Sequence, residues 1–254
     1  TAADALDHLE EFLTTTLGKG VIRAKDTPNF IANRIGVFSM LSTLYHTEKF
    51  GLGFDEVDAL TGPAIGRAKS ATYRTLDVVG IDTFSHVTKT MRDTLPNDPW
   101  NGVFVLPDWL NRFITEGKLG QKSGQGVFKK VGKDILVYDL KTNDYRKSNT
   151  ELDPELAEIL KLKNPQEKFQ KLRASSNPRA QFLWSIFRDL FHYCAVWLDN
   201  IADNARDLDL AIRWGYGWTF GPFETWQAAG WDWITAAIQE DMKAGKTICN
   251  QALP

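Results

Sequence analysis

The chain has 254 residues, of which 43% are hydrophobic and 24% are charged. This composition is typical of a globular protein that buries a core in one large domain or two smaller ones. Thirty basic residues against 32 acidic ones give a net charge of −2, so the overall charge gives no reason to expect nucleic acid or an anionic membrane as a partner. No apolar run reaches the roughly 18 residues of a membrane-spanning helix, and the acidic N-terminal stretch is unlike a signal peptide.

The cysteine and histidine residues do not indicate metal or redox chemistry. Cys194 and Cys249 belong to no Cys-x-x-Cys or Cys/His cluster, and the four histidines lack the spacing of metal ligands. We therefore expect buried or unreactive thiols, no metal site and a reducing, cytoplasmic location, although two cysteines do not exclude secretion.

The N-terminal segment resembles the end of a larger α/β unit. Residues 3–17 carry leucines on one side of an amphipathic helix, and residues 20–25 are typical of a short strand. A single strand would leave both of its edges unpaired. We therefore expect the rest of this unit to precede Thr1, and a terminal β-element that pairs with later residues is the alternative.

A long and mostly buried helix is predicted to begin at Thr27, which can cap it, and at Pro28, which suits a first helical turn. Apolar residues then recur around most of its circumference. Asn33 and Arg34 lie one turn from its start, where buried polar groups need partners. Contacts within the fold or a contact with a ligand would both satisfy them.

The middle of the chain alternates helical and irregular segments. Helices are expected within residues 54–93 and at 107–116, whereas the glycine content of residues 120–128 argues against a helix there. Residues 127–145 are consistent with a small surface hairpin. Residues 151–176 are charged, and we interpret them as a helical connector.

A weak internal repeat is the most informative pattern in the chain. Phe, Asp and Gly landmarks occur twice, as Phe30, Asp58 and Gly80 and again as Phe182, Asp209 and Gly230. The first interval is 28 residues in one copy and 27 in the other, and the second interval is 22 and 21. Because both intervals match, the pattern predicts a duplicated helical unit.

The repeat also shows where its two copies differ. When Phe30 is aligned with Phe182, Ser185 stands opposite Asn33 and Ile186 stands opposite Arg34. The shared scaffold therefore does not require this polar pair, which favours a functional role for Asn33.

Four segments resemble one enzyme family. Lys-Asp-Thr-Pro-Asn-Phe-Ile-Ala-Asn-Arg at residues 25–34 resembles the opening of the C-terminal domain of 3-hydroxyacyl-CoA dehydrogenases. Gly-Gln-Lys-Ser-Gly-Gln-Gly-Val-Phe at residues 120–128 resembles the Gly-x-Lys-(Ser/Thr/Asn)-Gly-x-Gly-Phe-Tyr signature near the end of that domain. Residues 215–224 resemble its Gly-x-Gly-x-x-x-Gly-Pro-Phe element, and residues 66–82 resemble the branch of multifunctional bacterial β-oxidation proteins.

This resemblance implies a mainly α fold made of two repeated helical units of the 6-phosphogluconate dehydrogenase C-terminal-domain-like type, with a small β-hairpin between them. It implies oxidation of an (S)-3-hydroxyacyl-CoA to the 3-oxoacyl-CoA, with NAD bound by a Rossmann domain that also supplies the catalytic His and Glu. In the multifunctional branch an enoyl-CoA hydratase domain can follow. Relatives with one repeat dimerise through it, which suggests opposed packing of the two repeats and a homodimer as a further assembly.

The Rossmann domain itself is missing from this sequence, because no Gly-x-Gly-x-x-Gly follows a strand. The expected organisation therefore comprises the tail of that domain, a first repeat, a connector with the hairpin and a second repeat. These parts span residues 1–26, 27–130, 131–176 and 177–254. We expect this fragment to be inactive alone.

The resemblance assigns roles to three residues. Asn33 is expected to contact the substrate and assist catalysis through its amide, whereas Arg34 is expected to be a structural hydrogen-bond hub. Lys122 matches the lysine that reaches the cofactor, and the alternative is a solvated loop lysine. Phe128 stands where many relatives have Tyr, so only apolar packing against the substrate remains.

A basic cluster and two further functions remain as alternatives. Arg67, Lys69 and Arg74 could meet CoA phosphates, although helix capping and surface solvation are the preferred interpretation. The chain could instead be a non-catalytic acyl-CoA-binding or assembly module. It could also be the helical half of a dehydrogenase for another 3-hydroxy substrate.

Overall fold

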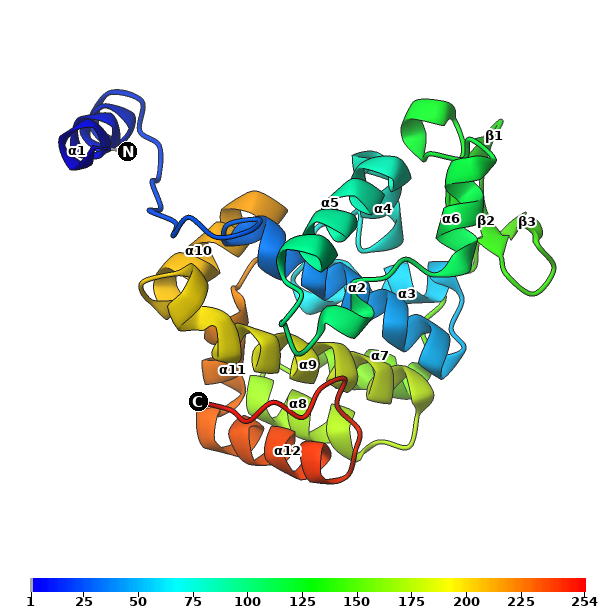
Figure 1. Ribbon diagram of the computed structural model, residues 1–254. Helices are drawn as coiled ribbons and strands as arrows, with labels where there is room; N and C mark the ends of the chain where they lie inside the picture. Colours follow the sequence, from blue (N-terminus) through cyan, green and yellow to red (C-terminus); the bar gives the residue numbers. More distant parts are fainter. Residues whose placement is uncertain (1) are drawn as a thin grey trace.

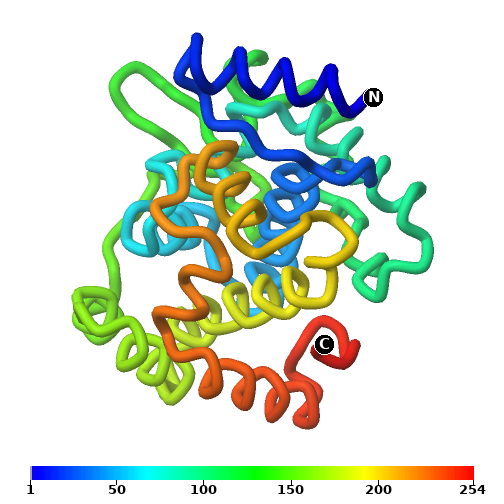
Figure 2. The backbone as a smooth tube through the Cα atoms, turned by 90° about the vertical axis from the view of Figure 1, so that its left-hand side faces the viewer, coloured from blue at the N-terminus to red at the C-terminus, as the bar shows by residue number. Residues whose placement is uncertain are grey.

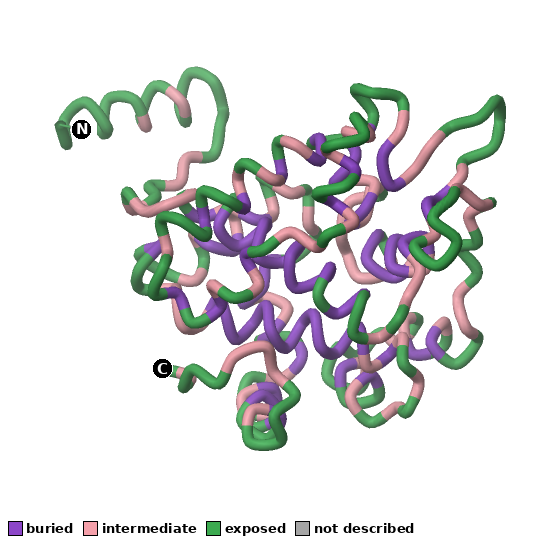
Figure 3. Tube along the Cα trace, turned by 45° about the vertical axis from the view of Figure 1, so that its right-hand side comes forward, coloured by how far each residue is buried: buried purple, intermediate pink, exposed green. Residues whose placement is uncertain are grey.

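The computed structural model describes residues 2–254, and Figure 1 shows a mainly helical protein with one small antiparallel sheet at its side. This confirms the predicted fold class. Buried residues concentrate in the central helices, while the N-terminal helix is almost entirely exposed (Figure 3). None of the helices in residues 2–254 has the length and apolarity that a membrane crossing requires.

The N-terminal segment lies across one end of the molecule (Figure 2). Helix α1 (Ala3–Glu11) continues into a π-helical turn, η1 (Phe12–Thr16), which confirms the expected helix. The strand predicted at residues 20–25 is wrong, because these residues are irregular and pair with no strand within residues 2–254. A strand is stable only when a neighbouring strand receives its backbone hydrogen bonds.

The first long helix begins later than its sequence predicts. Asn29 and Phe30 have positive φ angles of 64° and 51°, which are incompatible with a right-handed helix. Thr27 therefore belongs to a turn, in which its carbonyl oxygen accepts the N–H of Phe30 at 2.9 Å. Helix α2 starts at Ala32, and Gly51 ends it with a φ of 63°.

Helices dominate the first half of the chain. The first repeat contains α2 (Ala32–Phe50), α3 (Phe54–Thr61), α4 (Tyr73–Val79) and α5 (Ile81–Thr94). Helix α6 (Asp108–Thr115) and the short turns η2 (Pro63–Ile65), η3 (Asn101–Val103) and η4 (Gln121–Ser123) complete this half.

The predicted hairpin is part of a three-stranded antiparallel sheet with the order β1-β2-β3. Its strands are β1 (Phe128–Val131), β2 (Asp134–Asp139) and β3 (Asp144–Lys147). In the register, Phe128 lies opposite Val137, which in turn lies opposite Arg146. The connector is helical as predicted, with α7 (Pro154–Lys161) and α8 (Pro165–Ala174).

The second repeat supplies the other half of the core. It contains α9 (Pro178–Ile201), α10 (Ala205–Tyr216), α11 (Pro222–Ala229) and α12 (Trp231–Lys243). Helix α9 runs antiparallel to α2, since Phe38 stacks on Tyr193 at 3.8 Å and Phe50 meets Phe182 at 6.4 Å. The first long helices of the two repeats therefore face each other.

The landmarks of the sequence repeat make equivalent contacts. Asp58 accepts backbone hydrogen bonds from the start of α4, among them the N–H of Tyr73 at 2.6 Å. Asp209 likewise accepts the N–H of Phe223 at 2.9 Å at the start of α11. The glycines that join α4 to α5 and α11 to α12 have φ angles of 98° and 96°. The exact domain boundaries stay a prediction.

Candidate functional site

A cavity of about 400 Å³ lies where the first repeat meets the end of α10, within the roughly 300–1,000 Å³ of ligand pockets. Its walls come from α2, α5, α10 and the loop before α4. Most of the larger lining side chains are apolar or aromatic: Val37, Met40, Val79, Phe84, Val87, Tyr216 and Trp218.

Glycines allow α10 to approach α2 closely at this cavity. A Cβ atom at Gly36 would overlap the ring of Tyr216, and one at Gly215 would lie 3.2 Å from the Cβ of Ala32. Gly217 ends α10 with a φ of 66°. The Gly-Tyr-Gly sequence thus brings Tyr216 over α2 and turns the chain away directly afterwards.

Asn33 lines this cavity from the first turn of α2, and its side chain is exposed. Of the three predicted site residues, it alone is among the described residues that line the cavity. Its amide can both donate and accept a hydrogen bond. Its catalytic role stays a prediction.

Arg34 points into the core rather than the cavity and is fully buried. Its Nε donates to the hydroxyl of Tyr193 at 2.8 Å, and its Nη2 pairs with Asp98 at 3.2 Å. The guanidinium also lies 4.6 Å from the ring centre of Trp197. These contacts tie α2 to α9 and confirm the interpretation of Arg34 as a structural hub.

The glycine-rich segment is held against α4 by Asp77. Its carboxylate accepts the backbone N–H groups of Val127 and Phe128, both at 2.8 Å. A Cβ atom at Gly120 or Gly126 would overlap Asp77, which explains why the motif needs both glycines. Burial raises the pKa of Asp77 to about 6.

Lys122 and Phe128 lie beside this segment, outside the cavity lining. The Nζ of Lys122 pairs with Asp82 at the start of α5 at 2.5 Å, and the lysine side chain is 47% exposed. The Phe128 ring faces the guanidinium of Arg74 at 5.0 Å. Their predicted roles in cofactor and substrate binding stay predictions.

The sequence analysis left a ligand contact of Arg67 as the alternative to surface solvation. Arg67 is half-buried, and its Nε and Nη2 atoms are sealed from solvent and have no partner within residues 2–254. The guanidinium lies 4.2 Å from the Trp218 ring centre and lines the cavity. Burial lowers its pKa to about 9, so it stays charged at neutral pH. Lys69, two residues on, is exposed as expected.

Residues 2–254 contain neither a parallel sheet nor a cluster of side chains of the kind that binds metal ions. The sheet in residues 2–254 is antiparallel, whereas dinucleotides bind at the carboxyl ends of a parallel sheet beside a glycine-rich turn. The described part of the chain also holds no group of three His, Cys, Asp or Glu side chains that could bind a metal ion.

Two relatives match nearly the whole chain. A Bacillus subtilis protein named "Probable 3-hydroxyacyl-CoA dehydrogenase" is 43% identical over 230 residues, which cover 91% of this chain and 29% of that protein. A Rickettsia felis protein named "Putative fatty acid oxidation complex trifunctional enzyme" is 25% identical, over 93% of this chain and 32% of that protein. The chain thus spans about a third of the length of these relatives.

A solved structure supports the same fold. The crystal structure of 3-hydroxybutyryl-CoA dehydrogenase from Escherichia coli K12 aligns with a TM-score of 0.64, over 96% of this chain and 62% of that one. At 17% identity, this match concerns the fold alone. Residues 30–130 match the family described as "3-hydroxyacyl-CoA dehydrogenase, C-terminal domain". As the motifs predicted, residues 30–130 match this C-terminal domain, and nearly the whole chain is similar to a protein named a probable 3-hydroxyacyl-CoA dehydrogenase.

Proposed function

We propose that this chain is the substrate side of a dehydrogenase that oxidises (S)-3-hydroxyacyl-CoA to 3-oxoacyl-CoA with NAD in fatty acid β-oxidation. The observation that carries the proposal is Asn33, an exposed amide on the wall of a largely apolar cavity. An acyl chain suits apolar walls, and an amide suits the oxygens at its reacting end.

Asn33 acts by orientation and hydrogen bonding. Its NH₂ donates to the 3-oxygen or to the thioester carbonyl, where negative charge develops. Its own carbonyl holds a water or the catalytic His of another domain. NAD would supply the hydride acceptor and would be held mainly by a Rossmann domain, with Lys122 as the residue of this chain that would contact it.

The proposed setting is a larger protein. The Rickettsia felis relative is named a putative trifunctional enzyme, which supports a multi-domain context that includes a Rossmann domain and an enoyl-CoA hydratase domain. The homodimer and the cytoplasmic location stay predictions. We expect the isolated chain to bind acyl-CoA without reducing NAD.

The test is Asn33→Ala in a protein that joins this chain to a dinucleotide-binding domain. Loss of a transition-state donor raises the barrier by about 2–4 kcal/mol, which lowers kcat by roughly 30-fold to 1,000-fold. Ser185→Ala is the matched control, because Ser185 stands at the equivalent position of the second repeat. Wild-type turnover by Asn33→Ala would overturn the role of this residue. Acyl-CoA binding without turnover by any such protein would favour a non-catalytic binding module.

A further inference from the structure

Arg67 is held at the cavity by contacts between the two repeats. The carbonyl oxygen of Gly66 accepts the N–H of Thr219 at 2.8 Å, which fixes the loop before α4 against the end of α10. The guanidinium then lies against two aromatic rings of the second repeat, 4.2 Å from the centre of Trp218 and 5.6 Å from that of Phe187.

The cavity does not neutralise this charge. Arg67 is the one charged residue among the described residues that line it. No hydroxyl on the cavity wall accepts a hydrogen bond from the Nε or Nη2 atom of Arg67, since neither atom has a partner within residues 2–254. These Nε and Nη2 donors are shielded from solvent, and shielded donors with no acceptor are unfavourable unless a ligand supplies one.

The shape and the charge of the site narrow the class of ligand. A guanidinium presents a planar fork of donors that matches the two oxygens of a carboxylate. A single positive charge balances one carboxylate, whereas a phosphate dianion would need a second cation. The apolar walls between Arg67 and the rest of the cavity suit methylene groups.

We propose that the cavity accepts acyl chains whose far end carries a carboxylate, and that Arg67 binds this carboxylate. The substrates would then be CoA thioesters of dicarboxylic 3-hydroxy acids. The inference rests on the proposed function, with Asn33 at the reacting end of the acyl group and Arg67 at the other.

The experiment compares two probes that differ in one group. Binding of adipyl-CoA and of hexanoyl-CoA to this chain is measured by calorimetry at neutral pH. A charge-assisted hydrogen-bonded pair favours the carboxylate, so adipyl-CoA is expected to bind roughly tenfold more tightly or better. Arg67→Met should remove this preference, Arg67→Lys should retain part of it, and Lys69→Met on the same loop should leave it unchanged.

Equal affinities of the wild-type chain for the two thioesters would overturn the inference, even if no variant folds. An equal loss for both thioesters in a folded Arg67→Met protein would also overturn it, because the guanidinium would then only support the cavity. Turnover of 3-hydroxyhexanoyl-CoA without a preference for 3-hydroxyadipyl-CoA, in a protein joined to a dinucleotide-binding domain, rejects this inference alone. Absence of turnover with both substrates, and of binding by both thioesters, rejects the proposed function as well.

Discussion

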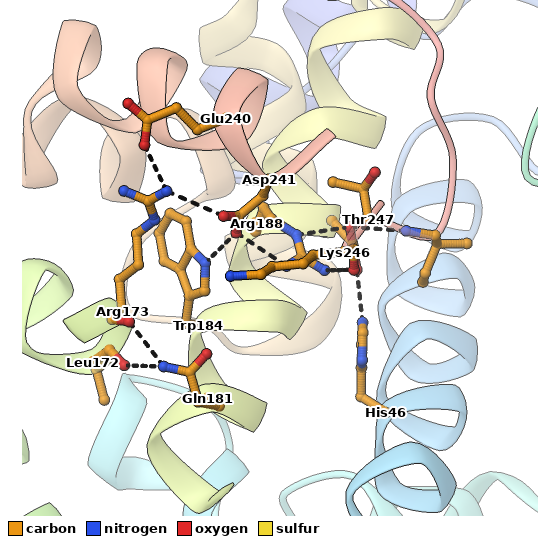
Figure 4. Close-up of polar contacts among 12 residues, drawn as sticks. His46, Leu172, Arg173, Gln181, Trp184, Arg188, Glu240, Asp241, Lys246 and Thr247 are labelled. Atoms are coloured by element: carbon orange, nitrogen blue, oxygen red, sulfur yellow. Dashed lines mark hydrogen bonds and ion pairs between the residues drawn. The ribbon is translucent and has the colours of Figure 1, made fainter. Parts of the chain in front are cut away.

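Two arginines, one fully buried and one half-buried, differ in whether the protein pairs their charge. Arg188 lies in a polar network between α9, α12 and the C-terminal segment (Figure 4). It pairs with Asp189 at 3.0 Å and Asp241 at 3.2 Å, and it donates to the carbonyl oxygen of Lys246 at 2.8 Å. Arg67, on the cavity, has neither a carboxylate nor a carbonyl partner within residues 2–254.

The pairing of Arg188 indicates a charge that stabilises the fold, whereas the lack of a partner for Arg67 indicates a charge that faces a ligand. In the network, each acid meets more than one donor: Trp184 donates to Asp241 at 2.7 Å, and His46 lies 2.6 Å from Asp189. This network satisfies the carboxylates of Asp189 and Asp241 and the guanidinium of Arg188, although the Nδ1 atom of His46 has no partner within residues 2–254. Arg67 departs from this pattern, because two of its donors at the cavity wall have no partner within residues 2–254. Polar groups left unpaired in this way tend to mark functional sites.

The largest expected effect comes from breaking the network around Arg188. Asp189→Ala leaves Arg188 and His46 buried without their shared acceptor, which should lower the free energy of unfolding by about 3–5 kcal/mol. Urea denaturation measures the loss. Asp199→Ala, at an exposed position on the same helix, should stay within about 0.5 kcal/mol of wild type. Equal stability of the two variants would mean that the network does not stabilise the fold.

The sequence predicts features that are set by nearby residues, and it does not predict features that depend on contacts with distant parts of the chain. The periodic apolar residues of α2 predict a buried helix, but its start is missed because Asn29 and Phe30 adopt positive φ angles without being glycine. A strand at residues 20–25 could not be judged from its own residues, since a strand needs a partner. Both errors concern boundaries and pairing rather than the fold class.

The two polar residues of the candidate site show the same difference between local and distant causes. Asn33 could be singled out because the second repeat has Ser185 in its place. For Arg67 the sequence left solvation and a ligand contact open, because its environment is decided by Trp218 and Phe187, which lie far along the chain. An arginine beside glycine and small residues has no sequence signal that distinguishes a solvated loop from a cavity wall.

The second prediction compares Met substitutions at Arg34, which is paired with a carboxylate, and at Arg67, which is not. Arg34→Met leaves the buried carboxylate of Asp98 without its cation, and should lower the free energy of unfolding by about 3 kcal/mol. Arg67→Met removes an unpaired charge, and should leave this free energy unchanged or raise it by about 1 kcal/mol. Each variant is the other's control, and the measurement is again urea denaturation. A comparable loss in both would show that Arg67 is as structural as Arg34.

The third prediction is a dependence of stability on pH, and it extends the comparison to buried acids. Burial raises the pKa of Asp189, but the hydrogen bond from His46 and the charge of Arg188 outweigh it and hold this pKa below the ordinary value. Asp58 accepts only backbone N–H groups, and burial raises its pKa from 3.8 to about 7. Between these values the folded chain holds a proton that the unfolded chain has lost. The contribution of Asp58 is therefore complete below pH about 4 and is lost as the pH rises through about 7.

Asp58→Asn, which cannot titrate, should remove this decline from the pH profile of the free energy of unfolding. Asp209→Asn is the matched variant in the second repeat. Burial raises the pKa of Asp209 to about 6, so the decline in stability that Asp209 causes should be complete at a lower pH than the decline caused by Asp58. Urea denaturation between pH 4 and 8, with wild type measured in parallel, gives the three profiles. An Asp58→Asn profile parallel to that of wild type would mean that the backbone hydrogen bonds at the start of α4 keep the carboxylate ionised, and that an acid needs no counter-charge to be stable in this core.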